Sequence, residues 1–140
     1  MLVLVLVLVA AVVVPVGIAL AVLVTLLVRK NRALHAELDA ALAGATVLIG
    51  PESAIYRGTT GSYPRSSGNG LIALTSERLL FRKLIGAGLD VERSHITGVR
   101  TATSFNRSVV GGRVHLVVAT PNGELGFFVD DLDEWVHALS

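Results

Sequence analysis

The sequence predicts a membrane-anchored, mainly β protein: one N-terminal transmembrane helix, then a small bent antiparallel barrel capped by a C-terminal helix. Three observations predict this fold class. The chain opens with a long apolar run that ends at positive charges, its middle alternates short apolar segments with turn residues, and it closes with an amphipathic segment. About 110 residues follow the apolar run, which is enough for one small domain but not for two.

Residues 2–28 contain no charged side chain and are predicted to form the transmembrane helix. A helix of that length is about 40 Å long and can cross the roughly 30 Å hydrocarbon core of a bilayer with some tilt. Backbone polar groups in lipid must bond within their own segment, so a single span has to be helical. A cleaved secretory signal fits less well, because it needs basic residues before a shorter apolar run and a small-residue cleavage site after it.

Positive charge at the end of the run predicts the orientation of the anchor. Arg29, Lys30 and Arg32 follow the run, and basic residues beside a span tend to stay in the cytoplasm. We therefore expect a single-pass protein of the plasma (inner) membrane with its N-terminus outside and residues 29–140 inside. The chain has no cysteine, which is compatible with a reducing compartment and excludes disulfides and thiol nucleophiles.

Residues 29–44 are predicted to form a juxtamembrane helix or linker. Leu34, Leu38 and Leu42 recur at helical spacing, and Gly44 is a typical helix stop. The narrow leucine stripe can lie on the protein's own domain, on the membrane surface, or on a partner helix. Three leucines are too few for a sustained coiled-coil seam.

From residue 45 the apolar pattern changes from helical to strand-like. The clearest turn signals are Thr75-Ser76-Glu77 and Pro121-Asn122-Gly123, each between two apolar runs. Six apolar side chains on two neighbouring strands are expected in the core: Val114, Leu116, Val118, Leu125, Phe127 and Val129. We expect strands over residues 45–49, 53–58, 70–75, 78–84, 88–93, 97–104, 112–119 and 124–129.

The last ten residues predict a short amphipathic helix. Asp131 and Glu134 have the spacing of a capping box at the helix start. The apolar residues that share one helical face are Leu132, Trp135, Val136 and Leu139. Such a face can cover the open end of a bent sheet.

Several segments together resemble bacterial pleckstrin-homology-like domains, close to the GRAM branch. They are Tyr56-Arg57-Gly58, GLIALTSERLLF at 70–81, ITGVR at 96–100, GFFVD at 126–130 and the helix with Trp135. The resemblance covers residues 45–140 and implies a seven-stranded bent barrel capped by the C-terminal helix. It also implies binding of lipid, peptide or protein without catalysis. With its anchor, the chain is similar to small single-pass membrane proteins of actinobacteria.

The charges indicate what such a domain would bind. Phosphoinositide-binding members place several cations around the loop between the first two strands, whereas residues 58–70 hold only Arg65. Residues 44–140 carry nine basic and nine acidic side chains, a balance that disfavours nucleic acid. We therefore expect a protein partner, or weak contact with anionic lipid headgroups. The candidate binding residues are Arg57, Arg65, Arg78, Arg82 and Lys83.

The sequence predicts no catalytic residue, metal ligand or cofactor. Only His35 and Asp39 have ligand-like spacing, and a metal site needs three or four ligands. Gly86-Ala87-Gly88 lacks the rest of a nucleotide-binding loop and predicts a turn. The favoured function is a membrane-tethered interaction module. The alternative is an accessory structural subunit that joins a larger membrane complex through its transmembrane helix.

Overall fold

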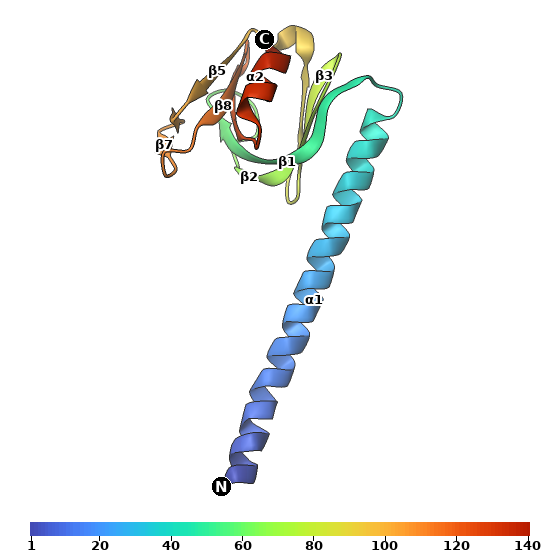
Figure 1. The fold of residues 1–140 in the computed structure, drawn as a ribbon, viewed down its shortest axis with the longest axis vertical. Coiled ribbons are helices and arrows are strands. Elements are labelled where there is room, and N and C mark those ends of the chain that lie inside the picture. The colour runs from blue at the N-terminus through green and yellow to red at the C-terminus, as the bar shows by residue number, and fades with distance from the viewer. The chain divides into compact units, whose positions relative to one another are not determined.

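The computed structural model describes all residues, 1–140, and divides them into two compact units, Met1–Ala33 and Leu34–Ser140. Figure 1 shows a long N-terminal helix, a β-sheet domain and a short C-terminal helix. The helices are α1 (Leu2–Leu42), α2 (Leu132–Leu139) and the short 3₁₀ helix Arg93–His95. The strands are β1 (Val47–Thr59), β2 (Gly68–Thr75), β3 (Arg78–Lys83), β4 (Leu89–Glu92), β5 (Gly98–Ala102), β6 (Ser104–Phe105), β7 (Ser108–Val109), β8 (His115–Thr120) and β9 (Gly123–Phe128).

The first unit contains the apolar part of α1 and the basic residues that follow it. Every side chain from Leu2 to Val28 is exposed, and Pro15 lies inside the helix without ending it. This helix is long and apolar enough to cross a membrane. The expected N-terminal span therefore has the helical structure that spanning requires.

The domain is built on one seven-stranded sheet in the order β4-β3-β2-β1-β9-β8-β5, with every neighbouring pair antiparallel. The central strand β1 is long and curved (Figure 1), and its pairing with β2 shifts register between Val47 and Glu52. It joins the two segments expected at 45–49 and 53–58 into one strand. The expected mainly β fold is confirmed, but the sheet does not close into a barrel, because β4 and β5 remain its two edges.

The inner face of the sheet carries the main core, which α2 covers. Tyr56, Phe81 and Phe127 form an aromatic group with ring centroids 5.4 to 5.8 Å apart. Trp135 of α2 is fully buried among this core cluster. The Asp131 carboxylate accepts a hydrogen bond from the Glu134 N–H at 3.2 Å, which confirms the predicted helix start.

The end of α1 belongs to this second unit and covers part of the outer face of the sheet. Leu34, Leu38 and Leu42 are buried in a second cluster with side chains of β2 and β3, namely Leu71, Ala73 and Leu80. The structure thus places the leucine stripe on the protein's own domain, one of the surfaces that the sequence left open. As a result, β2 is buried on both faces from Leu71 to Thr75.

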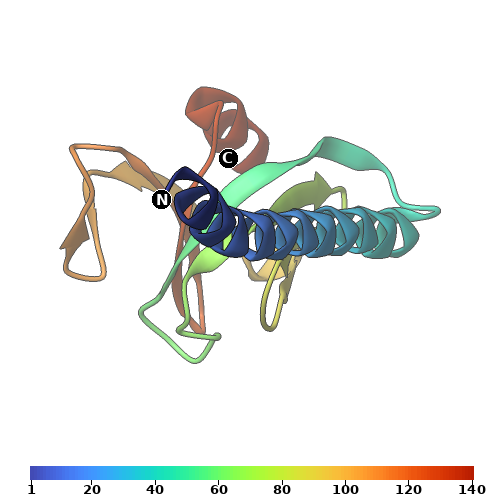
Figure 2. The same cartoon turned by 90° about the horizontal axis from the view of Figure 1, so that it is seen from below.

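Another part of the outer face is covered by the β6–β7 hairpin, which the sequence did not predict. Figure 2 shows it (orange) extending from the sheet. Its turn residues Asn106 and Arg107 both have positive φ, 50° and 63°, as a two-residue type I′ hairpin requires. Phe105 packs over Gly126 so closely that a Cβ on this glycine would lie 2.4 Å from the Phe105 ring.

Five of the six predicted core residues on β8 and β9 or at the end of β9 are buried, and Val114 is not. Val114 is 39 % exposed because β8 begins one residue later, at His115. Residues 110–113 form a tight turn instead of the start of the strand: the Arg113 N–H donates to the Val110 carbonyl at 2.8 Å. That turn is what shortens the segment expected at 112–119.

Candidate functional site

The structure distributes the predicted binding residues over separate places. Arg78, Arg82 and Lys83 lie on β3, Arg57 lies on β1, and Arg65 lies in the loop between β1 and β2. The residues predicted to set the topology, Arg29, Lys30 and Arg32, are all exposed on α1.

Arg78 and Arg82 pair with carboxylates. Arg82 Nη1 donates to Asp90 Oδ1 at 2.6 Å, and Arg82 Nε lies 3.5 Å from Glu37 Oε1. Arg78 Nη1 lies 3.7 Å from the other Asp90 oxygen. Neighbouring acids offset the positive charge of these arginines, so this part of β3 attracts anions only weakly.

Lys83 supports the loop between β1 and β2. It is buried, its Nζ donates to the Ser66 carbonyl oxygen, and this nitrogen lies 5.5 Å from the centroid of the Tyr56 ring. The Tyr56 hydroxyl donates to the Pro64 carbonyl at 2.6 Å. Burial, with a further contribution from Tyr63, raises the pKa of Tyr56 to about 12, so its hydroxyl stays protonated at neutral pH. Both side chains hold the loop against the sheet.

Arg65 is exposed in the same loop, next to a shallow groove of about 390 Å³. The far side of the groove includes Ile85 in the loop between β3 and β4, and this isoleucine is 71 % exposed. A cation and an exposed aliphatic side chain thus lie in or beside the two loops that form the groove. The lining residues are Ser66, Ser67, Gly68, Asn69, Leu84 and Ile85.

Arg57 belongs to a different group of side chains, on the outer face of the sheet. Its Nη2 donates to Ser108 Oγ at 2.8 Å, and its guanidinium carbon lies 5.2 Å from the centroid of the Phe128 ring. The guanidinium carbon of Arg113 lies 4.3 Å from the same centroid. Neither arginine forms an ion pair. We call the following residues the arginine–aromatic cluster: Arg57, Phe105, Arg113, His115 and Phe128.

His115 is the buried polar member of this cluster. Its ring centroid lies 4.4 Å from that of Phe128, and its Nδ1 lies 3.1 Å from the Ala102 carbonyl oxygen. A carbonyl can only accept, so Nδ1 carries the proton, while Nε2 is buried without a partner. Burial lowers the pKa of His115, Arg57 and Arg113 lower it further, and the bond to Ala102 only partly opposes them.

Sequence reasoning named Arg57 but did not assign Arg113 or His115 to a site. The period-two alternation of β8 places His115 on the face opposite Leu116 and could have identified it as an outer-face residue. No local pattern could have found Arg113, because its position over Phe128 depends on the turn at 110–113 and on the pairing of β8 with β9.

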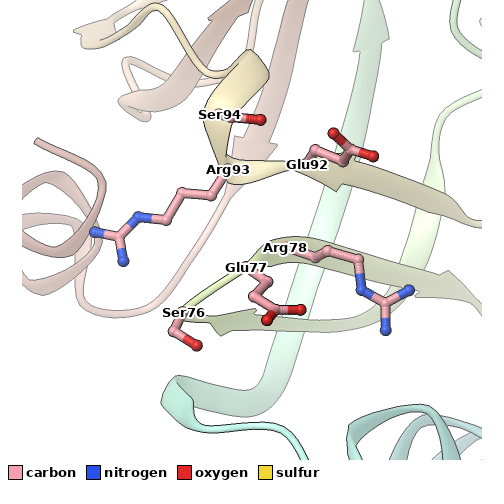
Figure 3. Close-up of a pocket in the computed structure, with 6 residues that line it drawn as sticks. All are labelled: Ser76, Glu77, Arg78, Glu92, Arg93 and Ser94. Atoms are coloured by element: carbon pink, nitrogen blue, oxygen red, sulfur yellow. The ribbon is translucent and has the colours of Figure 1, made fainter.

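A separate cleft of about 390 Å³ lies between the β2–β3 turn and the segment after β4 (Figure 3). In Figure 3 the side chains of Arg78 and Arg93 point away from each other. Arg93 Nη2 donates to the Ala138 carbonyl oxygen at 3.0 Å. This hydrogen bond links α2 to the short 3₁₀ helix after β4. No three His, Asp or Glu side chains come together in a way that could hold a metal ion.

No protein-family model matches the sequence, and no curated protein matches it significantly. Among solved structures, the chain is similar to the crystal structure of the C-terminal domain of an unknown protein from Leishmania infantum. The two share 20 % sequence identity with a TM-score of 0.51, over 77 % of this chain and 93 % of that one. At this identity the likeness concerns the fold alone.

Proposed function

We propose that this protein is a single-pass membrane protein that presents a pleckstrin-homology-like interaction module at the cytoplasmic face of the plasma membrane. The module binds a membrane-associated protein partner and, weakly, anionic lipid headgroups. The observation that carries the proposal is the apolar run of α1, whose side chains from Leu2 to Val28 are all exposed. An apolar surface of this size needs a covering, and the hydrocarbon core of a bilayer supplies it.

The orientation rests on charge. Arg29, Lys30 and Arg32 follow the run and are exposed, so the positive-inside tendency supports a cytoplasmic domain. The pleckstrin-homology-like assignment is supported by a bent sheet of seven strands with a C-terminal helix over its inner face. The resemblance implies a bent barrel, whereas this sheet is open, with edges at β4 and β5.

A protein partner is favoured over lipid by the way the cations are used. Arg78 and Arg82 pair with acids, and Lys83 is buried. Arg57 is half-buried and donates to Ser108, which leaves Arg65 as the exposed candidate cation, beside the groove near Ile85. One such cation gives an anionic surface only about 1 kcal/mol of attraction. By contrast, the edge strands β4 and β5 offer unpaired backbone groups that a partner strand can use.

Two reciprocal chimeras test the proposal. In the first, residues 2–28 become an all-leucine helix of the same length, with Arg29, Lys30 and Arg32 kept. In the second, residues 1–33 stay and Leu34–Ser140 is replaced by an unrelated soluble domain. Each chimera and the parent chain are crosslinked in cells and purified in mild detergent, and the crosslinked proteins are compared.

The proposal expects partners of the parent chain to be retained by the all-leucine chimera and lost by the domain replacement. The reverse pattern would support the accessory-subunit alternative, because recognition would then lie in the transmembrane helix.

A further inference from the structure

We propose that the arginine–aromatic cluster is a binding site for a phosphate group, held between the guanidinium groups of Arg57 and Arg113. This site lies on the outer face of the sheet, away from the groove beside Arg65. It does not depend on the membrane topology or on the partner proposed above.

The first argument is uncompensated charge. The guanidinium carbons of Arg57 and Arg113 lie 5.2 Å and 4.3 Å from the centroid of the same Phe128 ring, and these two distances limit how far apart the groups can be. Neither guanidinium has an acidic partner. After Glu92 the next acidic residue in the chain is Glu124, and both of its oxygens accept from Arg100, at 2.9 and 3.1 Å. Two neighbouring cations without a counter-ion repel each other, and an anion between them removes this cost.

The second argument is that one of the two cations, Arg57, is already held in place by a hydrogen bond. Ser108 Oγ accepts from Arg57, which ties this arginine to the β6–β7 hairpin. Arg113 follows a tight turn in which Gly111 and Gly112 both have positive φ, 53° and 72°. A planar guanidinium presents two parallel N–H donors, which match the oxygens of a phosphate group. Little ordering of the Arg57 side chain is therefore needed when an anion binds.

The third argument concerns buried atoms without partners. Arg57 Nε is a buried donor with no acceptor, and the Nε2 atom of the fully buried His115 has no partner either. Such groups are rare in folded proteins. The titratable groups that act on His115 are Arg57 and Arg113, both cationic. A bound phosphate would offset their field and favour the imidazolium form of His115.

The test uses the full chain in zwitterionic detergent micelles, with its histidines labelled at the ring Cε1. The Cε1–H signals of the four histidines are followed by NMR while inorganic phosphate replaces chloride at constant pH and ionic strength. We expect a saturable shift of the His115 signal. His35, His95 and His137 lie outside the cluster and serve as internal references.

Two variants separate the site from general electrostatics. Arg113 is exposed, so Arg113→Gln should leave the fold intact and weaken phosphate binding about tenfold or more, the loss expected for a charge-assisted contact. Arg78→Gln removes the same charge at the start of β3, outside the cluster, and should leave the affinity unchanged. Equal weakening by both variants would overturn the proposal.

A second arm identifies the source of the phosphate. The full chain is placed in nanodiscs of phosphatidylcholine, with or without phosphatidic acid, whose headgroup is a phosphate monoester. If inorganic phosphate shifts the His115 signal in both kinds of nanodisc, the ligand is a soluble phosphorylated molecule. If the signal shifts only in nanodiscs that contain phosphatidic acid, the ligand is a lipid headgroup. The absence of a shift in every condition would show that the cluster binds no phosphate.

Discussion

At the scale of single residues, His115 should make the stability of the domain depend on pH. Burial lowers its pKa below the ordinary 6.5, so the unfolded chain takes up a proton that the folded chain does not. The free energy of unfolding should therefore be at its full value above about pH 7 and fall as the pH drops through about 6.5. Below the folded pKa this contribution levels off. Chemical denaturation of the full chain in detergent at a series of pH values measures it.

The variant His115→Leu should remove this slope and, because the bond to Ala102 is lost, lower stability at every pH. His137 is exposed on α2, so His137→Leu is the matched control and should keep the slope. An unchanged slope in His115→Leu would mean that another group causes the pH dependence.

At the scale of elements, α2 is held to the sheet chiefly by Trp135. Its side chain is fully buried, and its indole N–H donates to the Glu52 carboxylate on β1. Trp135→Ala should reduce the free energy of unfolding by about 3–5 kcal/mol, whereas Trp135→Phe keeps most of the packing and should cost less. Thermal denaturation of the full chain measures both. If Trp135→Ala left the midpoint where it is, α2 would not cover the core as described.

The last turns of α1 are predicted to stabilise the domain as well. Leu38 is fully buried against the outer face of β2 and β3, so Leu38→Ala should cost about 2–5 kcal/mol. His35 lies on the exposed side of the same turns, and His35→Ala should change stability by less than about 0.5 kcal/mol. Urea titration of both variants tests this directly, and equal stabilities would contradict the packing of α1 on the domain.

Most elements of the fold could be predicted because their patterns are local. The Asn122-Gly123 turn and the alternating apolar residues beside it gave β8 and β9, and Asp131 marked the start of α2. The β6–β7 hairpin was missed because its strands have two residues each and its turn places Arg107 where glycine is usual. A bent barrel was expected, whereas the sheet is open, because barrel formation depends on long-range strand geometry that short patterns do not carry.

The candidate site could be predicted only in part, for a related reason. Sequence reasoning selected cations by their number and position, and it could not tell that Arg82 is paired while Arg113 is not. Whether a cation is paired depends on acids that are distant in sequence, such as Glu37 for Arg82. Arg57 was named, but the residues around it, Ser108, His115 and Phe128, come from three other strands.

At the scale of the whole molecule, the proposed topology can be tested with one cysteine. The chain has none, and Ser140 is exposed at the C-terminus, so Ser140→Cys introduces a single reactive thiol. In intact cells this thiol should resist membrane-impermeant reagents, and it should react once the membrane is permeabilised. Labelling in intact cells would place the domain on the outer side. A cysteine at Leu2 is the reciprocal control and should label in intact cells.

In the proposed topology, the short connection between the apolar run and the domain would limit how far the domain can reach for a partner. Five residues separate Val28 from Leu34, the first residue buried in the domain. Even fully extended, this stretch spans only about 20 Å, whatever direction the domain takes. A domain of this size has a radius of gyration of about 13 Å, so in the proposed topology its whole surface would stay in a thin layer beside the bilayer. The domain would then meet only molecules that enter that layer. Inserting glycine and serine residues into the connection should let the domain reach partners farther from the membrane.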